Sequence, residues 1–549
     1  MKIAGVLFLA LGSLASAAPP PRAVMERYCI DCHDGEAKKG GVDLDAILGE
    51  DVGQHAKVWE RAIKQLNARH MPPVGKKRPD EAGYAAMVKE LTAELDAAAV
   101  RKPEPGRTAT LRRLTRTEYQ NAVRDLLGVE FDARAALPAD ESSHGFDNIT
   151  VGDLPPALLD RYLTAAQKIA RLAVGNSEKP EITTIRVRGD VTQEYHVPGL
   201  PLGTRGGVNI PQVFSRAGDY EVQVRLQRDR NEQVEGMHGA HQLQVLLDRE
   251  VQAEFTVKPA RDKNYEKIDA HLKARLHIAG GQHDLGVTFL PEGAPVLERL
   301  RQPYQASFNL HRHPRLSPAV YQVTITGPYL AQGFGDTPSR RLIFGSGSTE
   351  ASAVLAPILR RAWRRPVTEV DLARVLPFAQ EAPNFEAGIE AALAAILVSR
   401  EFLFRTEADQ PKSPYRLNDL ELASRLSFFL WSSIPDDELL QSPLDVERQV
   451  RRMLRDPRAK SLVTNFADQW LYLRNLESIT PDARLFPDFD HNLRESLRTE
   501  TSMLFDDILQ NDRSVLELLR TDRTWLDERL AAHYGIPHIQ GSRFREVKL

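Results

Sequence analysis

Apolar residues recur at every third or fourth position through much of the first hundred residues. In "AKVWERAIKQLNAR" this spacing runs through Trp59 and Leu66, and in "EAGYAAMVKELTAELDAA" it places Met87 and Leu91 on one face. Such periodicity predicts amphipathic helices. The stretch "RKPEPGR" that follows is rich in Pro and Gly, which indicates a linker. We therefore predict an all-α first domain over residues 24–101.

Helical spacing continues in the next segment, residues 108–175. A Thr-x-x-Glu capping pattern at Thr115 and Glu118 begins one helix, and Gly128 ends it. A polar loop then leads to "ALLDRYLTAAQKIARLAVG", whose apolar positions again follow a helical period. The pattern predicts a helical domain over this segment.

Between residue 181 and about residue 330 the pattern changes to alternation of apolar and polar positions. The alternating runs are "DYEVQVRLQ", "QLQVLLD", "VQAEFTV", "HDLGVTFL" and "VYQVTITGPY", with Gly, Pro and Asn or Asp between them. Several short strands joined by turns predict a β-sandwich over residues 181–330.

From about residue 350 to the end of the sequence, helical spacing returns. We predict one helical domain over residues 350–412 and another over residues 413–549. The predicted fold class is therefore multidomain, with an all-α first domain, a β-sandwich middle domain and an α-helical C-terminal half.

The first residues have the pattern of a targeting sequence. "MKIAGVLFLALGSLASAAPPPRA" has one Lys, an apolar run from Ile3 to Leu14 and the small-residue stretch "ASA". This order is typical of a secretory signal peptide, which we place at residues 1–17. An uncleaved membrane anchor is the other interpretation, but the run is short for a bilayer and a Pro cluster follows it. We expect a periplasmic or extracellular protein with no integral membrane segment after cleavage.

The composition limits the classes of partner that the protein is expected to bind. The 549 residues include 72 basic and 75 acidic side chains, a net charge of −3. Nucleic-acid binding favours a clear basic excess, so we expect no nucleic-acid partner. The sequence also has no Gly-x-Ser-x-Gly, His-Glu-x-x-His, P-loop or dinucleotide motif. A hydrolase therefore has no motif support.

The two cysteines of the chain lie three residues apart in "YCIDCHDG", and a histidine follows the second directly. Cys-x-x-Cys-His is the attachment pattern of c-type haem. Cys29 and Cys32 would form thioethers with the porphyrin vinyl groups, and His33 would supply one axial nitrogen to the iron. A zinc site would need further Cys or His ligands at similar spacing, and a thioredoxin-like pair would follow a strand. The sequence favours one covalently attached haem c.

A second axial ligand to the haem iron is expected in "ARHMPPVG". Met71 is the first candidate, because a thioether raises the reduction potential and the following Pro residues restrict the chain around it. His70 competes with Met71, and adjacency means that only one of the two can bind the iron. His55 is a more distant third candidate.

Three further clusters have both a functional and a structural interpretation. The loop "LPADESSHGFDN", with Asp140, Glu141, Ser142, Ser143, His144, Asp147 and Asn148, has oxygen ligands for a hard cation, but turn stabilisation is favoured. "RRAWRRPV" could bind an anion, but a solvated helix face with Trp363 buried is favoured. Exposed rings in the β-region (Tyr195, Phe214, Tyr220) would suit carbohydrate, but core positions are favoured. The carboxylate pairs Asp436/Asp437 and Asp506/Asp507 are expected at helix caps or faces.

Long stretches of the chain resemble known families. "YCIDCHDGEAKKGGVDLD" through "WERAIKQLNARHMPP" resembles the planctomycete-type cytochrome c domain. "LRRLTRTEYQNAVRDLLGV", "RRAWRRPVTEVDLARV", "FEAGIEAALAAILVSREFLFRTE", "YRLNDLELASRLSFFLWSSIPDDELL" and "WLDERLAAHYGI" resemble domains of unknown function in large exported proteins of planctomycetes and acidobacteria. The resemblance covers well over half of the chain. It implies attachment through Cys29 and Cys32, His33 as proximal ligand and Met71 as distal ligand.

The sequence departs from these relatives in two places. Relatives usually continue past "HYGI" into further C-terminal domains, so the last helical domain is expected to continue in full-length relatives. Many relatives also carry a cysteine pair around "RLIFGSGSTEASAVL", where this chain has none. We expect this region to be held by packing alone.

Two functions follow from these patterns. The first is an exported monohaem c-type cytochrome that acts in electron transfer or as the redox part of a haem-dependent oxidoreductase, with an unknown redox partner. The alternative is an extracellular polysaccharide-binding or scaffold protein with an accessory haem, for which carbohydrate is the expected partner. Fold analogy alone supports the alternative at this stage.

Overall fold

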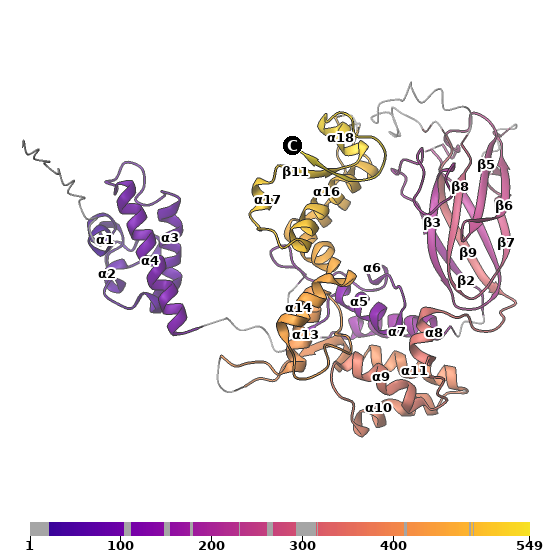
Figure 1. Ribbon diagram of the computed structural model, residues 1–549, viewed down its shortest axis with the longest axis horizontal. Coiled ribbons are helices and arrows are strands. Elements are labelled where there is room, and N and C mark those ends of the chain that lie inside the picture. Colours follow the sequence, from indigo (N-terminus) through magenta and orange to yellow (C-terminus); the bar gives the residue numbers. More distant parts are fainter. Residues whose placement is uncertain are drawn as a thin grey trace, which may run out of the picture. The chain divides into compact units, whose positions relative to one another are not determined.

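A computed structural model of the chain describes residues 21–103, 111–147, 154–175, 179–229, 231–260, 267–291, 315, 317–410, 414–482, 485–486 and 488–549. The predicted signal peptide therefore lies outside the described residues. The chain divides into two compact units (Figure 1). The first comprises residues 1–108 with 410–416, and the second comprises residues 109–409 with 417–549.

The described part of the first unit is built from helices and short 3-10 turns. The helices are α1 (Pro21–Tyr28), α2 (Leu44–Ile47), α3 (Ala56–Asn67) and α4 (Glu81–Arg101), with turns at Ile30–Cys32, Lys39–Gly41 and Val52–His55. Asp80 caps α4 by accepting a hydrogen bond from the Gly83 amide, as Asp at this position commonly does. Trp59 and Leu66 of α3 and Met87 and Leu91 of α4 are buried in one small core, on the faces that their spacing predicts.

The helical base of the second unit combines two segments that lie far apart in the sequence. Its elements are β1 (Leu111–Arg113), α5 (Arg116–Leu127), α6 (Ala133–Ala136), α7 (Pro156–Val174), α8 (Pro338–Phe344), α9 (Ala351–Trp363), α10 (Glu369–Gln380), α11 (Phe385–Leu397), α12 (Arg400–Leu403) and β10 (Phe404–Thr406). Strand β1 pairs antiparallel with β10, from Leu111 opposite Thr406 to Arg113 opposite Phe404. Buried residues of both segments form one hydrophobic core, so the β-rich segment between them is an insertion.

Local sequence signals fix the ends of α5. Thr115 and Glu118 form the reciprocal capping box expected from their spacing, and Gly128 ends the helix with a φ of 66°. A side chain at Gly128 would meet the backbone of Pro338 and Ser339 at 3.3 Å, so the site also needs a small residue. This close approach brings the start of α8 against the end of α5.

The inserted β-region consists of two four-stranded antiparallel sheets. The strands are β2 (Glu181–Arg186), β3 (Arg205–Phe214), β4 (Gly218–Leu226), β5 (His241–Leu247), β6 (Glu250–Val257), β7 (Lys273–Ile278), β8 (Gly281–Phe289) and β9 (Val320–Tyr329). Their orders are β2-β9-β4-β7 and β3-β8-β5-β6. The sheets lie face to face (Figure 1) and share one core, which is the arrangement of a β-sandwich.

The remaining residues of the second unit are again mainly helical. Their elements are α13 (Asp419–Leu430), α14 (Val446–Arg455), a π-helical stretch (Leu462–Ala467), α15 (Asp468–Trp470), α16 (His491–Gln510), α17 (Glu517–Arg520), β11 (Arg523–Leu526), α18 (Glu528–Tyr534) and β12 (Arg545–Lys548). Strands β11 and β12 pair antiparallel beside α16 (Figure 1). The β-rich middle and the helical C-terminal half agree with the predicted multidomain fold. None of the described helices is long and apolar enough to cross a membrane.

Candidate functional site

The cysteine segment forms one tight turn at the end of α1. The Cys29 carbonyl accepts hydrogen bonds from the Cys32 and His33 amides, both at 3.2 Å, and the Ile30 carbonyl accepts from the His33 amide at 2.8 Å. These bonds place both thiols on a single turn of chain, with His33 directly after it. Both cysteines are free thiols and are partly buried. The turn therefore presents two adjacent sulfur nucleophiles and one imidazole.

The environment of Cys29 does not favour a reactive thiolate. Burial, with a smaller contribution from neighbouring Cys32, raises the pKa of Cys29 to about 11. Redox-active cysteine pairs of the thioredoxin type need a lowered pKa. Within the described residues, no third His, Cys, Asp or Glu joins the pair to form a group able to hold a metal. The local chemistry therefore gives no support to a dithiol redox pair or a zinc site.

Two buried ring nitrogens of the first unit have no hydrogen-bond partner among the described residues. They are Nδ1 of His33 and Nε1 of Trp59, whose side chain is 2% exposed. Folded domains seldom leave such atoms unsatisfied. Nε2 of His33 is not one of the fully buried atoms, so it is the ring nitrogen open to a ligand. An open imidazole nitrogen directly after two free thiols fits a bound prosthetic group in this unit.

The residues present therefore fit haem c. Cys29 and Cys32 would hold the group by thioether bonds, and His33 would bind the iron through Nε2. Tyr28 and Ile30, which pack against the core of the first unit, would exclude water from that side. Bound there, haem would supply a one-electron Fe(III)/Fe(II) couple.

Two of the three candidate distal ligands, Met71 and His70, lie on an exposed loop after α3. Met71 is 40% exposed, and its carbonyl accepts a hydrogen bond from the Tyr84 hydroxyl at 3.1 Å. Arg78 donates to the carbonyls of Pro72 and Arg69, both at 2.8 Å, and so holds the loop closed. These bonds fix the backbone of the loop and leave the Met71 thioether unconstrained by them.

The competing histidines occupy different environments. His70 is exposed beside Met71, and its amide donates to the Gln65 carbonyl at 3.0 Å. Nε2 of His55 lies 2.5 Å from Glu50 Oε2, so this ring already has a carboxylate partner. Among the described hydrogen bonds, none joins Met71 or His70 to His33. The assignment of Met71 as distal ligand therefore stays a prediction.

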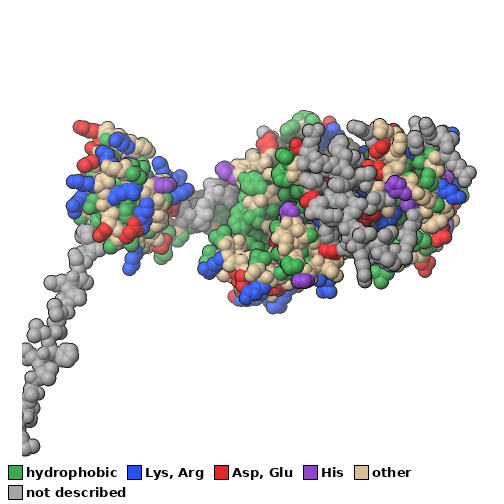
Figure 2. Space-filling view, turned by 90° about the horizontal axis from the view of Figure 1, so that it is seen from above, with side chains coloured by type: hydrophobic (Ala, Val, Ile, Leu, Met, Phe, Trp, Pro, Cys, Tyr) green, Lys and Arg blue, Asp and Glu red, His purple; other side chains and the backbone are tan. Residues whose placement is uncertain are grey.

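The loop that carries Met71 is locally basic. Residues 69–78 include Arg69, Lys76, Lys77 and Arg78 and no acidic residue. Arg69 pairs with Glu81 at 2.5 Å, at the start of α4. On the face of the first unit visible in Figure 2, basic and acidic side chains are otherwise interspersed. The positive charge around Met71 is thus a local feature in a unit of mixed charge.

The "RRAWRRPV" segment is structural. Trp363 is buried in the helical core and donates from Nε1 to Ser399 Oγ at 2.9 Å. Each arginine has a protein acceptor: Asp437 Oδ1 for Arg360 (2.7 Å), the Asp125 carbonyl for Arg361 (2.6 Å), the Glu401 and Phe404 carbonyls for Arg364 (2.6 and 2.7 Å) and Asp371 for Arg365 (2.7 and 2.9 Å). These contacts link α9 to its neighbours, so the anion-binding interpretation has no free cation to rest on.

The "LPADESSHGFDN" loop uses its carboxylates in the same way. Asp140 accepts from the Arg116 amide at 2.7 Å and pairs with Arg113, while burial raises its pKa. Asp147 pairs with Arg474 at 2.7 Å. Gly145, with a φ of 88°, lets the loop pass against the Tyr472 ring. Asn148 lies outside the described residues. The described part of the loop joins two segments of the second unit and offers no cluster of cation ligands.

The predicted aromatic positions of the β-region separate into two groups. Phe214 and Tyr220 are buried and meet edge to face at 4.8 Å, so they are core residues. Tyr195 is 39% exposed and lines a cavity at one end of the sandwich.

Among the predicted carboxylate pairs, Asp436 pairs with Arg452 and Arg458, and Asp507 pairs with Arg513 and Arg523.

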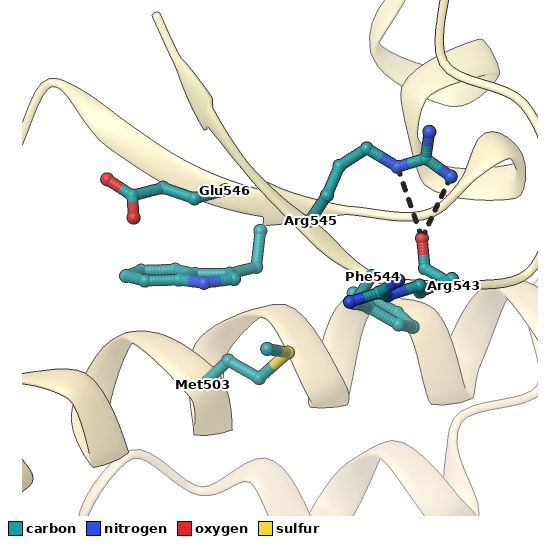
Figure 3. Close-up of a pocket in the computed structure, with 6 residues that line it drawn as sticks. Met503, Arg543, Phe544, Arg545 and Glu546 are labelled. Carbon is teal, nitrogen blue, oxygen red and sulfur yellow. Dashed lines mark hydrogen bonds between the residues drawn. The ribbon is translucent and has the colours of Figure 1, made fainter.

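Another cavity, of about 560 Å³, lies between α16 and the paired strands β11 and β12 (Figure 3). Met503 of α16 and Phe544 form apolar parts of its lining. Arg545 bends back to the Arg543 carbonyl, with contacts at 3.3 and 3.4 Å, and Glu546 lies at the rim. The lining combines apolar side chains with two arginines and a glutamate, and Glu546 Oε1 pairs with Arg523 at 3.1 Å.

Comparison with protein-family models gave four matches. The model described as Planctomycete cytochrome C matches residues 29–75, a range that runs from the first cysteine past Met71. Models described as proteins of unknown function match residues 112–175 (DUF1587), 350–407 (DUF1595) and 417–536 (DUF1592). The curated proteins and the solved structures contain no match to the chain. The matched ranges leave the β-sandwich outside all four families.

Proposed function

We propose that this chain, in which a planctomycete cytochrome c domain is joined to three domains of unknown function, is an exported monohaem cytochrome that takes up and passes on single electrons. The observation that carries the proposal is the turn at the end of α1. It combines two free thiols, an imidazole whose Nε2 is open to a ligand, and an apolar wall.

Each residue of the turn has a distinct task in this proposal. Cys29 and Cys32 tether the group covalently, which prevents its loss from a protein outside the cytoplasm. His33 binds the iron, and the tight turn that holds its amide limits the freedom of the ring. Met71 is the proposed second ligand, and a thioether in that position raises the reduction potential relative to a second imidazole.

The route of the electron to and from the haem is proposed only in outline. The first unit acts either as a shuttle or as the electron outlet of an oxidoreductase whose other parts lie in the second unit. The basic loop around Met71 would favour a redox partner with an acidic surface. Export is proposed from the N-terminal signal pattern.

A reduced-minus-oxidised absorption spectrum tests the proposal. The full chain is produced with the haem-attachment machinery and compared with the Cys29→Ser/Cys32→Ser variant. We expect a c-type α-band from the natural chain, haem that stays attached to the polypeptide after denaturation, and no covalent haem in the variant. A natural chain that shows no α-band, while a known c-type cytochrome matured in the same cells does, would contradict the proposal.

A further inference from the structure

One end of the β-sandwich gathers polar residues from five separate segments. Strand β3 starts there, β8 ends there and β5 starts there, because Arg205 and Leu243 both lie opposite Phe289. The start of β9 and the loop after β2 lie at the same end, since Arg186 pairs with Gln322 and Arg205 donates to the Pro318 carbonyl at 3.2 Å. Loops at one end of a sandwich are a common place for ligand sites.

These segments surround a cavity of about 350 Å³. That volume lies in the range of small-molecule sites. The lining residues are Glu194, Tyr195, His196, Thr204, Arg205, His241, Pro291 and Ser317. Most carry a hydrogen-bonding side chain, so the cavity is polar although the core of the sandwich is apolar.

A bulge in β3 shapes the base of the cavity. Gly206 and Gly207 have φ values of 57° and 88°, and a side chain there would overlap the carbonyls of Gln193 and Val287 at 2.3 and 1.8 Å. The register shifts at this point, between Arg205 and Val208. Bulges of this kind redirect a neighbouring side chain and are frequent beside functional sites.

The buried side chain of Gln193 fixes the bulge to the opposite sheet. Its Oε1 accepts from the Gly207 and Val320 amides at 3.0 and 2.9 Å, and its Nε2 donates to the Val320 carbonyl at 2.8 Å. The chain position next to Gln193 is Glu194. The bulge and the Gln193 network therefore hold Glu194 and Arg205 in a defined place beside each other.

The cavity is close to electrically balanced. Burial raises the pKa of Glu194, while Arg205, Arg315 and a hydrogen bond from Ser317 act in the opposite direction. Arg315 itself is 1% exposed and pairs with buried Glu235 at 3.1 Å. One carboxyl group and one guanidinium group thus line the cavity, and Arg205 Nη1 also donates to the Gln193 and Pro318 carbonyls, both at 3.2 Å. A strongly charged ligand would leave one of them unbalanced.

The mouth of the cavity carries an aromatic ring. Tyr195 is 39% exposed, and its carbonyl accepts from the Gly206 amide at 2.8 Å, which ties it to the bulge. His196 is also exposed at the mouth, and its Nε2 lies 2.9 Å from the Leu200 carbonyl. An amphipathic ring at the rim above hydrogen-bonding groups offers one apolar face and several polar contacts.

We infer that this end of the sandwich binds a neutral sugar unit of a polysaccharide. A sugar ring presents hydroxyls to Glu194, Arg205, Thr204 and Ser317, and its C–H face packs on Tyr195. The size, the charge balance and the aromatic rim suit this ligand class better than an anion. The inference is independent of the haem proposal, because it concerns other residues in another unit.

Affinity electrophoresis of the full chain tests the inference. Native gels contain xylan, glucomannan or mixed-linkage β-glucan as neutral polymers, with polygalacturonate as the anionic comparison. We expect at least one neutral polymer to retard the natural chain. Tyr195→Ala removes the stacking surface and should weaken this binding about tenfold. Glu194→Gln removes a charged hydrogen-bond acceptor and should weaken it by a similar factor of about ten.

Matched variants at the opposite end of the sandwich serve as controls. Glu250→Gln changes an exposed carboxylate at the start of β6, and Tyr329→Ala removes a ring at the end of β9. Both should bind like the natural chain, and all four variants should keep its thermal unfolding profile. The inference is overturned if no neutral polymer retards the natural chain, if only polygalacturonate does, or if Tyr195→Ala binds as tightly as Tyr329→Ala.

Discussion

The two units of the molecule bury different kinds of residue. The first has a small core of eight buried apolar side chains, which are Val24, Met25, Leu44, Trp59, Leu66, Tyr84, Met87 and Leu91. Its ion pairs lie at exposed positions. The second has a much larger core and also buries charged pairs such as Arg315 with Glu235. A core of this size supplies limited stability, so the first unit gains more than the second from a covalently attached group.

The units also differ in how far the chain itself covers their key residues. In the second unit, arginines satisfy carbonyls and carboxylates that the chain itself supplies. Both units bury polar atoms without a hydrogen-bond partner among the described residues, such as Nδ1 of His33 in the first and the Tyr119 hydroxyl in the second. What distinguishes the first unit is that Cys29 and Ile30, at its attachment turn, are only partly covered. We therefore expect the first unit to depend on its prosthetic group and the second to fold without one.

The largest effect is expected from removing covalent haem. In the Cys29→Ser/Cys32→Ser chain, residues 21–103 should lose most of their protection from proteolysis, while residues 111–549 should keep theirs. The reason is that only the first unit lacks its covalently attached haem. Limited proteolysis with mass-spectrometric mapping measures both regions in one sample. Equal protection of residues 21–103 from proteolysis in the haem-loaded and haem-free chains would contradict the proposed dependence of the first unit on haem.

Within the second unit, Arg364→Met should destabilise strongly. Arg364 is 7% exposed, burial lowers its pKa to about 10, and its guanidinium donates to the carbonyls of Glu401 and Phe404. Loss of the donor leaves buried acceptors unsatisfied, at a cost of about 3 kcal/mol in the free energy of unfolding. Urea denaturation measures the loss. Exposed Arg400→Met is the control, with an expected change below about 0.5 kcal/mol; similar values for the two variants would contradict this account.

A smaller, pH-dependent effect is expected from Asp371→Asn. The bidentate pair with Arg365, aided by hydrogen bonds from Thr368, holds the pKa of Asp371 well below its ordinary value. A lowered folded-state pKa stabilises the protein above the unfolded pKa, and this contribution is lost as the pH falls below about 4. The variant should be about 2 kcal/mol less stable at pH 7, with a narrower gap at pH 3. A gap of constant size in denaturation experiments at both pH values would exclude this origin.

The smallest structural change is expected at the distal ligand. Met71 and His70 are both exposed, so replacing either should leave the fold of the first unit intact. In haem-loaded protein, Met71→Ala should abolish the near-infrared band of a Met-to-iron bond, while His70→Ala should retain it. Loss of the band only in His70→Ala would assign the distal position to the histidine.

Much of the fold could be predicted because the patterns are local. The alternation in β4 places Tyr220, Val222 and Val224 in the core with polar residues between them, as "DYEVQVRL" indicates. The joint core of the segments around α5 and α11 could not be predicted in this way. Helical periodicity shows which face is buried, but not which distant helix covers it, and the pairing of Leu111 with Thr406 spans the whole β-insertion.

The two candidate sites also differ in how far the sequence alone indicates them. Cys29, Cys32 and His33 are visible in the sequence because covalent attachment fixes their spacing. The sandwich cavity draws Glu194, Arg205 and Ser317 from different loops, so no short motif contains it. The local signal that could have indicated it is the pair Gly206–Gly207 directly after Arg205, since consecutive glycines in a strand often mark a bulge.

Mass spectrometry of the full chain matured with the haem-attachment machinery tests the central claim most directly. We predict a denatured chain whose mass is increased by one haem, with the group on the peptide that contains Cys29 and Cys32. The Cys29→Ser/Cys32→Ser chain should show no increase. A natural chain of unmodified mass, obtained beside a fully loaded reference cytochrome, would contradict the account.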